Sequence, residues 1–200
     1  MNQQSILTYN TITDIQNNSK LFLEGFHFLI VGLDLKPNKL INIKRIIKSL
    51  GGKVSDQFTN EINIGLINRV GLTNYRKLKQ YRIQCVTIKW LYDCDQKKTL
   101  LSFELYRVLP FQGLVIVCTQ IELSDRKILE TKVNNNGGEF NHKLIKDNCT
   151  HLVAIKPEGD KYIHAKSWMN VHIVKLDWID ECIRRKGITL YINTIYIHLL

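Results

Sequence analysis

Trp90-Leu91-Tyr92-Asp93-Cys94 has a second version near the end of the chain, Trp178-Ile179-Asp180-Glu181-Cys182, so a tryptophan precedes a cysteine by four residues in each half. The two stretches lie 88 positions apart, and Gly25 and Gly113 are separated by the same 88 positions. A pair of adjacent glycines also occurs twice, at 51–52 and 137–138, with a spacing of 86. Landmarks that return in one order at nearly one period indicate an internal duplication with a small insertion or deletion.

The duplication divides the 200 residues into two modules, each long enough to bury a core of its own. We predict a flexible leader over residues 1–20, a first module over 21–108, and a second module with a C-terminal tail over 109–200. The join, residues 106–111, contains no Ser/Gly-rich spacer. A join this short predicts that the modules share an interface instead of moving freely.

The pattern of apolar residues predicts strands that alternate with helices in the first module. The run Phe28–Val31 indicates a buried strand, and apolar residues spaced three and four apart after Pro37 indicate a helix that ends at Gly51. Further elements are predicted as strands at 62–67 and 83–86, a short helix at 75–79, and a last helix through Trp90.

The second module repeats this order. Strands are predicted at 114–118, 150–155 and 171–174, and a β-prone tail at 191–200. Ser124 is expected to cap one helix, whose inner face holds Ile128, Leu129 and Val133, and Asp160 is expected to cap a short helix over 161–168. Both tryptophans, Trp90 and Trp178, are interpreted as core residues. Alternating strands and helices predict an α/β fold with parallel sheets covered on both faces.

The net charge of +10 is concentrated in the first half. Residues 1–110 hold 16 Lys and Arg against 8 Asp and Glu, whereas residues 111–200 hold 12 against 10. No acidic residue occurs between Glu61 and Asp93, while the same stretch holds six cations: Arg69, Arg76, Lys77, Lys79, Arg82 and Lys89. Such a basic surface attracts phosphates or acidic segments, and the alternative is a solvated face without a ligand.

Several functional classes find no support in the sequence. The five cysteines form no Cys-x-x-Cys pair and have no histidine at zinc-ligand spacing. Several lie inside apolar runs and are interpreted as small core residues, and their odd number suits a reducing compartment. We expect an intracellular, soluble protein, since no secretory signal and no membrane-length apolar run is evident. His151 and His164 have no evident nucleophile or carboxylate partner. We therefore expect neither an enzyme nor a cofactor or metal.

Together, these landmarks resemble the BRCT repeat, the C-terminal domain of the breast-cancer protein that occurs in DNA-damage proteins. The resemblance rests on the Gly-Gly after the first helix, the strand Thr150-His151-Leu152-Val153, and Trp-x-x-x-Cys in the last helix. It covers residues 21–108 and 109–190. It implies two tandem repeats, each a four-stranded parallel sheet with two helices on one face and one on the other.

Tandem BRCT repeats commonly bind phosphoserine or phosphothreonine peptides, and the resemblance assigns a phosphate site to the second repeat. The family uses a Ser or Thr hydroxyl at the end of the first strand, the next backbone N–H and a lysine that opens the second helix. Thr119, Gln120 and Lys161 match these positions, and Arg126 matches an arginine that some members add. Gln120 departs from the usual glycine. Lys166 is a possible accessory cation.

The first repeat lacks the same residues. Val31 stands where Thr119 does, and Thr73 or Asn74 stands where Lys161 does, so its phosphate pocket is expected to be degenerate. This pattern is most similar to the topoisomerase-II-binding, replication-checkpoint scaffolds. The resemblance therefore implies a nuclear scaffold module that binds a phosphorylated protein. Two alternatives stay open: a DNA-binding module that uses the basic surface of repeat 1, and a phosphate-independent protein interaction module.

Overall fold

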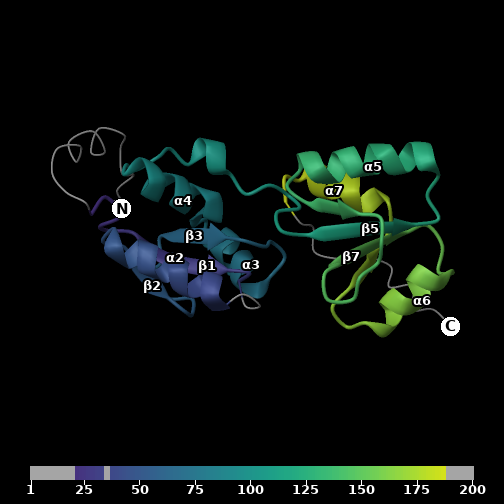
Figure 1. Ribbon diagram of the computed structural model, residues 1–200, viewed down its shortest axis with the longest axis horizontal. Coiled ribbons are helices and arrows are strands. Elements are labelled where there is room, and N and C mark those ends of the chain that lie inside the picture. The colour runs from purple at the N-terminus through teal and green to yellow at the C-terminus, as the bar shows by residue number, and fades with distance from the viewer. Residues whose placement is uncertain (1–20, 34–36, 188–200) are drawn as a thin grey trace, which may run out of the picture.

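The computed structural model describes residues 21–33 and 37–187 and contains two α/β repeats of like topology (Figure 1). Each repeat holds one four-stranded sheet, ordered β2-β1-β3-β4 in the first and β6-β5-β7-β8 in the second, with parallel pairing throughout. The fold predicted from the duplication is thus confirmed. The predicted leader, 1–20, and the β-prone tail, 191–200, lie outside the described residues.

The first repeat places two helices on one face of its sheet and one on the other. Its strands are β1 (His27–Val31), β2 (Lys53–Ser55), β3 (Ile64–Ile67) and β4 (Gln84–Thr87), and its helices are α2 (Pro37–Ser49), α3 (Thr73–Gln80) and α4 (Ile88–Lys97). Alternate residues of β3 separate the faces, because Ile64 and Leu66 pack with α2 and α4, whereas Ile67 packs with α3.

The second repeat has the same layers. Its strands are β5 (Val115–Thr119), β6 (Glu139–Asn141), β7 (His151–Ala154) and β8 (His172–Val174), and its helices are α5 (Leu123–Asn135), α6 (Asp160–Ser167) and α7 (Asp177–Arg184). Leu129 of α5 and Trp178 of α7 belong to one buried cluster, while Tyr162 of α6 belongs to another. The helices α5 and α7 therefore cover one face, and α6 covers the opposite face.

The structure corrects several local predictions. The edge strands β2 and β6 had no predicted counterpart, because three residues are too few to display an alternation of apolar and polar side chains. Ser124 caps no helix, because α5 begins at Leu123 and its N-cap residue is Glu122. Neither α5 nor α6 has a side-chain hydrogen bond from its N-cap residue. Asp160 is the first residue of α6, and Gly159 precedes it as the N-cap. Ile128 is exposed and does not share the buried face of Leu129.

The tryptophans are core residues, as predicted. Trp90 is fully buried and its ring centroid lies 5.3 Å from that of Phe103, while its indole Nε1 donates to the carbonyl oxygen of Leu101 at 2.9 Å. Trp178 packs 5.6 Å from Phe111. Four of the five cysteines are buried, which confirms their interpretation as small core residues.

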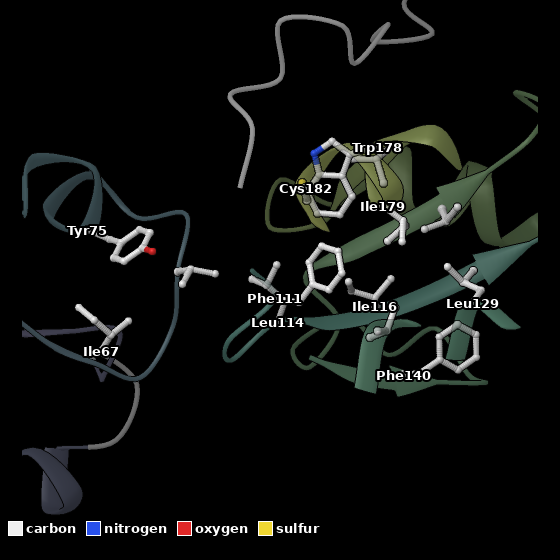
Figure 2. Packing of buried hydrophobic residues seen from close by; sticks show 14 of the residues in the cluster. Ile67, Tyr75, Phe111, Leu114, Ile116, Leu129, Phe140, Trp178, Ile179 and Cys182 are labelled. Atoms are coloured by element: carbon white, nitrogen blue, oxygen red, sulfur yellow. The ribbon is translucent and has the colours of Figure 1, made fainter. Parts of the chain in front are cut away.

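The two repeats share an interface, as the short join predicts. Figure 2 shows Ile67 and Tyr75 of the first repeat facing a group that contains Phe111, Leu114 and Trp178, and all five residues belong to one buried cluster. The backbone is also joined, because the N–H of Val70 donates to the carbonyl oxygen of Gln112 at 3.0 Å. The apolar core therefore runs from α3 of the first repeat into the α5/α7 layer of the second.

Candidate functional site

The predicted site begins at the carboxyl end of β5. Thr119 is the last residue of this strand, and Gln120 follows it with a positive φ of 60°. Gly32 holds the corresponding position in the first repeat, with φ of 88°. The glutamine thus adopts the backbone conformation that glycine adopts in the other copy, although a Cβ makes that conformation costly.

The side chain of Gln120 compensates for this conformation by binding the loop that leads into α6. Its Nε2 donates to the carbonyl oxygen of Glu158 at 2.8 Å, and its Oε1 accepts from the backbone N–H of Lys156 at 3.0 Å. These two bonds tie the strand end to the residues just before α6.

Lys161 is the second residue of α6, and its side chain reaches back to the same strand end. Its Nζ donates to the carbonyl oxygen of Cys118 at 3.0 Å and to that of His142 at 2.8 Å. Cys118 directly precedes Thr119, so the ammonium lies over the end of β5 and beside the chain that leaves β6. The side chain of Lys161 therefore joins the start of α6 to the ends of β5 and β6.

Arg126 approaches the strand end from α5. Its Nη2 donates to the carbonyl oxygen of Ile121 at 3.0 Å, and its buried Nε has no acceptor among the described residues. Burial raises the pKa of the Cys118 thiol, while Arg126 and Lys161 both act to lower it. The two cations thus approach one point from different helices. Lys166 is exposed in the last turn of α6.

The first repeat presents different chemistry at the corresponding point. The apolar Val31 ends β1, and Asn74 is the second residue of α3, so neither the hydroxyl nor the lysine has a counterpart. The side-chain amide of Asn68 donates to the carbonyl oxygen of Gly32 at 2.8 Å, and Lys39 Nζ donates to the amide oxygen of Asn68 at 3.4 Å. Sequence reasoning assigned no role to Asn68 or Lys39, and no motif points to them.

The predicted basic surface is not one continuous face. Arg76, Lys77 and Lys79 are exposed on α3, whereas Lys89 belongs to α4 on the other side of the sheet and pairs with Asp93. The remaining members also differ in setting, because Arg82 follows α3 with a positive φ of 55° and Arg69 is half-buried at the junction between the repeats. A shared surface is therefore limited to the cations on and just after α3.

His151 is a buried structural residue, in agreement with its interpretation from the sequence. Its ring stacks on Trp178 with centroids 4.9 Å apart and an interplanar angle of 16°. Burial, aided by the positive fields of His172 and Arg69, lowers the pKa of His151 to about 3. Among the described residues no three His, Cys, Asp or Glu side chains gather as a metal site, and no helix has the length and apolarity needed to span a membrane.

Comparison with known families matches each half of the chain separately. The model of the BRCA1 C-terminus (BRCT) domain matches residues 18–94, and the model of the twin BRCT domain matches residues 114–178. Together the two matches cover more than half of the 200 residues. They also fall on the two repeats that the structure shows.

Individual relatives carry the same domain. PAX-interacting protein 1 of Mus musculus is 36% identical over 76 residues, which are 38% of this chain and 7% of that protein. The S-M checkpoint control protein rad4 of Schizosaccharomyces pombe is 26% identical over 176 residues, 83% of this chain and 26% of that protein. The chain thus spans only a small part of the length of these relatives.

A solved structure reproduces the arrangement of both repeats. The structure of Rad4 BRCT1,2 in complex with a Crb2 phosphopeptide superposes with a TM-score of 0.61 at 24% identity, covering 85% of this chain and 96% of that one. At this identity the likeness establishes the fold. With both halves matched by family models and the paired sheets in place, the chain belongs to the BRCT family and carries two BRCT repeats in tandem.

Proposed function

We propose that this tandem module binds phosphoserine or phosphothreonine peptides through its second repeat and serves as a nuclear, non-enzymatic scaffold in DNA-damage or replication-checkpoint signalling. One observation carries the proposal. Arg126 and Lys161 reach from two helices toward the end of β5, where Thr119 supplies a hydroxyl. The first repeat has no such grouping at the corresponding strand end among its described residues.

The chemistry of the strand end suits a phosphate. A phosphorylated side chain carries about −1.5 to −2 charge and three strong acceptor oxygens. In the described structure the ammonium of Lys161 donates to two neutral carbonyl oxygens. A phosphate offers it a charged acceptor instead, and hydrogen bonds between charged groups are the stronger kind. The positive end of the helix dipole at the start of α6 also favours an anion.

The relatives support the class of ligand but leave the repeat open. Rad4 BRCT1,2 has been solved with a Crb2 phosphopeptide and with a Mdb1 phosphopeptide. The assignment to the second repeat comes from this chain alone. It depends on Thr119, Arg126 and Lys161 in that repeat, and on Val31 and Asn74 in the other.

An oriented phosphopeptide library followed by titration of the selected peptide tests the proposal. We expect Lys161→Glu and Thr119→Ala each to weaken binding by about tenfold or more, because each removes a charge-assisted hydrogen bond worth roughly 1.5–3 kcal/mol. Asn74→Glu in the first repeat is the matched control, and we expect less than about a threefold change for it.

Two results would count against this function. One is equal affinity for the dephosphorylated peptide. The other is a loss on Asn74→Glu as large as that on Lys161→Glu, which would move the site to the first repeat. Far-UV circular dichroism of each variant shows whether the fold is kept. Thr119→Ala tests the site without removing the hydrogen bonds from Lys161 to the carbonyl oxygens of Cys118 and His142.

A second candidate, DNA binding, has a specific observation in its favour. Arg76, Lys77 and Lys79 are exposed on α3, and none forms an ion pair with a described carboxylate. Phosphate-backbone contacts by these cations would give a steep fall in affinity with salt. A titration of a short duplex in which added salt leaves the affinity unchanged would exclude this candidate.

A further inference from the structure

A cleft of about 470 Å³ opens where the first repeat meets the segment that leads to the second. Ile67, Asn68 and Thr87 lie at or just after the carboxyl ends of β3 and β4 and line the cleft. Residues of α4 and of the connecting segment, residues 105–109, line it as well. Ligands of open α/β sheets bind beyond the carboxyl ends of the strands, and this volume falls within the usual range of ligand sites.

The charges that line the cleft are all positive. They belong to Lys39 of α2, Lys89 of α4 and Arg107 of the connecting segment, and no carboxylate lines the cleft. Lys89 and Arg107 pair with acids beside the cleft, Asp93 and Glu104. Lys39 donates to the neutral amide oxygen of Asn68 and has no carboxylate partner among the described residues. Lys39 is therefore the lining cation that an anionic occupant can bind without displacing a described carboxylate.

The rim of the cleft is aliphatic. Leu105 is 89% exposed and Leu109 is 40% exposed, and both line the cleft. The segment that carries them is anchored, because Arg107 pairs with Val86 as an isolated antiparallel bridge and the hydroxyl of Tyr106 donates to a carboxylate oxygen of Asp93 at 2.7 Å. The leucines are therefore presented from a fixed backbone beside the three cations.

We propose that this cleft docks a short acidic peptide segment of a partner protein that also carries an aliphatic side chain. Carboxylates of the segment would face Lys39, Lys89 and Arg107, and its aliphatic side chain would cover Leu105 and Leu109. A protein segment fits better than nucleic acid. Covering the two leucines gives a favourable free energy of burial only when the occupant has apolar surface of its own. The cleft is built on the first repeat, so it operates independently of the phosphate site proposed in the second.

Unphosphorylated heptapeptides that vary in acidic, basic, amide and aliphatic residues provide the probe. The pool is captured on the immobilised full chain, and the most enriched peptide is then titrated. We expect enrichment of Asp or Glu together with Leu or Ile. Lys39→Glu and Leu105→Ser should each weaken the selected peptide by about fivefold or more. Lys48→Glu and Ile41→Ser, both on exposed positions of α2 outside the cleft, are the matched controls.

The outcomes separate this proposal from the phosphopeptide function. Lys161→Glu should leave the acidic peptide bound, whereas it weakens phosphopeptide binding by about tenfold or more if the second-repeat site is correct. The docking proposal is overturned if the pool shows no acidic enrichment, or if Lys39→Glu behaves like Lys48→Glu. It is also overturned if Lys39→Glu removes binding of a short DNA duplex and leaves the peptide unaffected, since the cleft is then a nucleic-acid site.

Discussion

Gln120 shows how one residue can keep a backbone geometry that glycine provides elsewhere in the same chain. Its φ of 60° matches the left-handed conformation of Gly32 in the first repeat. A side chain in that region costs about 1–2 kcal/mol. The bonds from its amide to Glu158 and Lys156 offset part of this cost and hold the loop before α6.

Replacing Gln120 separates these two contributions. Gln120→Ala loses both hydrogen bonds and keeps the backbone strain, whereas Gln120→Gly loses the bonds and relieves the strain. We therefore expect the glycine variant to be more stable than the alanine variant by about 1 kcal/mol, measured by urea denaturation. Equal stabilities would show that the left-handed conformation costs nothing at this position.

The buried His151 predicts how stability responds to acid. Its pKa is lowered to about 3 in the folded chain, so only the unfolded chain takes up its proton near pH 6.5. His151 therefore contributes to the free energy of unfolding above pH 6.5, and this contribution is lost as the pH falls toward 3. Between pH 7 and pH 5 we expect the wild type to lose about 2 kcal/mol more unfolding free energy than His151→Phe, which keeps an aromatic ring against Trp178. Parallel losses in urea melts of the two proteins would refute this role.

At the scale of elements, the last helices of the two repeats use their tryptophans differently. The indole N–H of Trp90 in α4 is bonded to Leu101, whereas that of Trp178 in α7 is buried without an acceptor among the described residues. We expect Trp90→Phe to destabilise the chain by about 1 kcal/mol more than Trp178→Phe, because only the first loses a hydrogen bond. Denaturation midpoints measure the difference, and the reverse order would contradict the assigned bonding.

Helices and strands whose apolar residues recur at a regular spacing could be predicted from the sequence, and those without such a spacing could not. The helix α2 follows from apolar residues at three and four spacing and from Gly51, whose φ of 89° ends it. The strands β2 and β6 hold three residues each, so their existence depends on pairing with β1 and β5. Ser124 is a favoured cap, yet the N-cap of α5 is Glu122, two residues earlier in the chain.

The candidate site, like the fold, could be predicted only in part from the sequence. Thr119, Arg126 and Lys161 could be named by resemblance, and the structure places all three near the end of β5. The acceptors of Lys161 could not be foreseen, because the carbonyls of Cys118 and His142 come from segments that only the sheet brings together. No sequence pattern predicted the cleft beside α4, because the residues that line it come from several separate stretches of the chain.

At the scale of the whole molecule, Gly113 controls how closely the repeats approach. A Cβ at this position would lie 2.1 Å from the carbonyl oxygen of Asn68, while a Cβ at its counterpart Gly25 would meet nothing within 4 Å. Both glycines have positive φ, so Gly25→Ala controls for backbone strain. We expect Gly113→Ala to separate the repeats and to split calorimetric unfolding into two transitions. A single transition like that of Gly25→Ala would show that the interface adapts.

The central claim is that the second repeat of this tandem BRCT module, and not the first, holds the phosphate. A crystal structure of the chain with its library-selected phosphopeptide tests it most directly. We predict phosphoryl oxygens within about 3 Å of the Thr119 hydroxyl, the Gln120 backbone N–H and Lys161 Nζ. A phosphate seated instead beside Gly32 and Asn74 of the first repeat would contradict it.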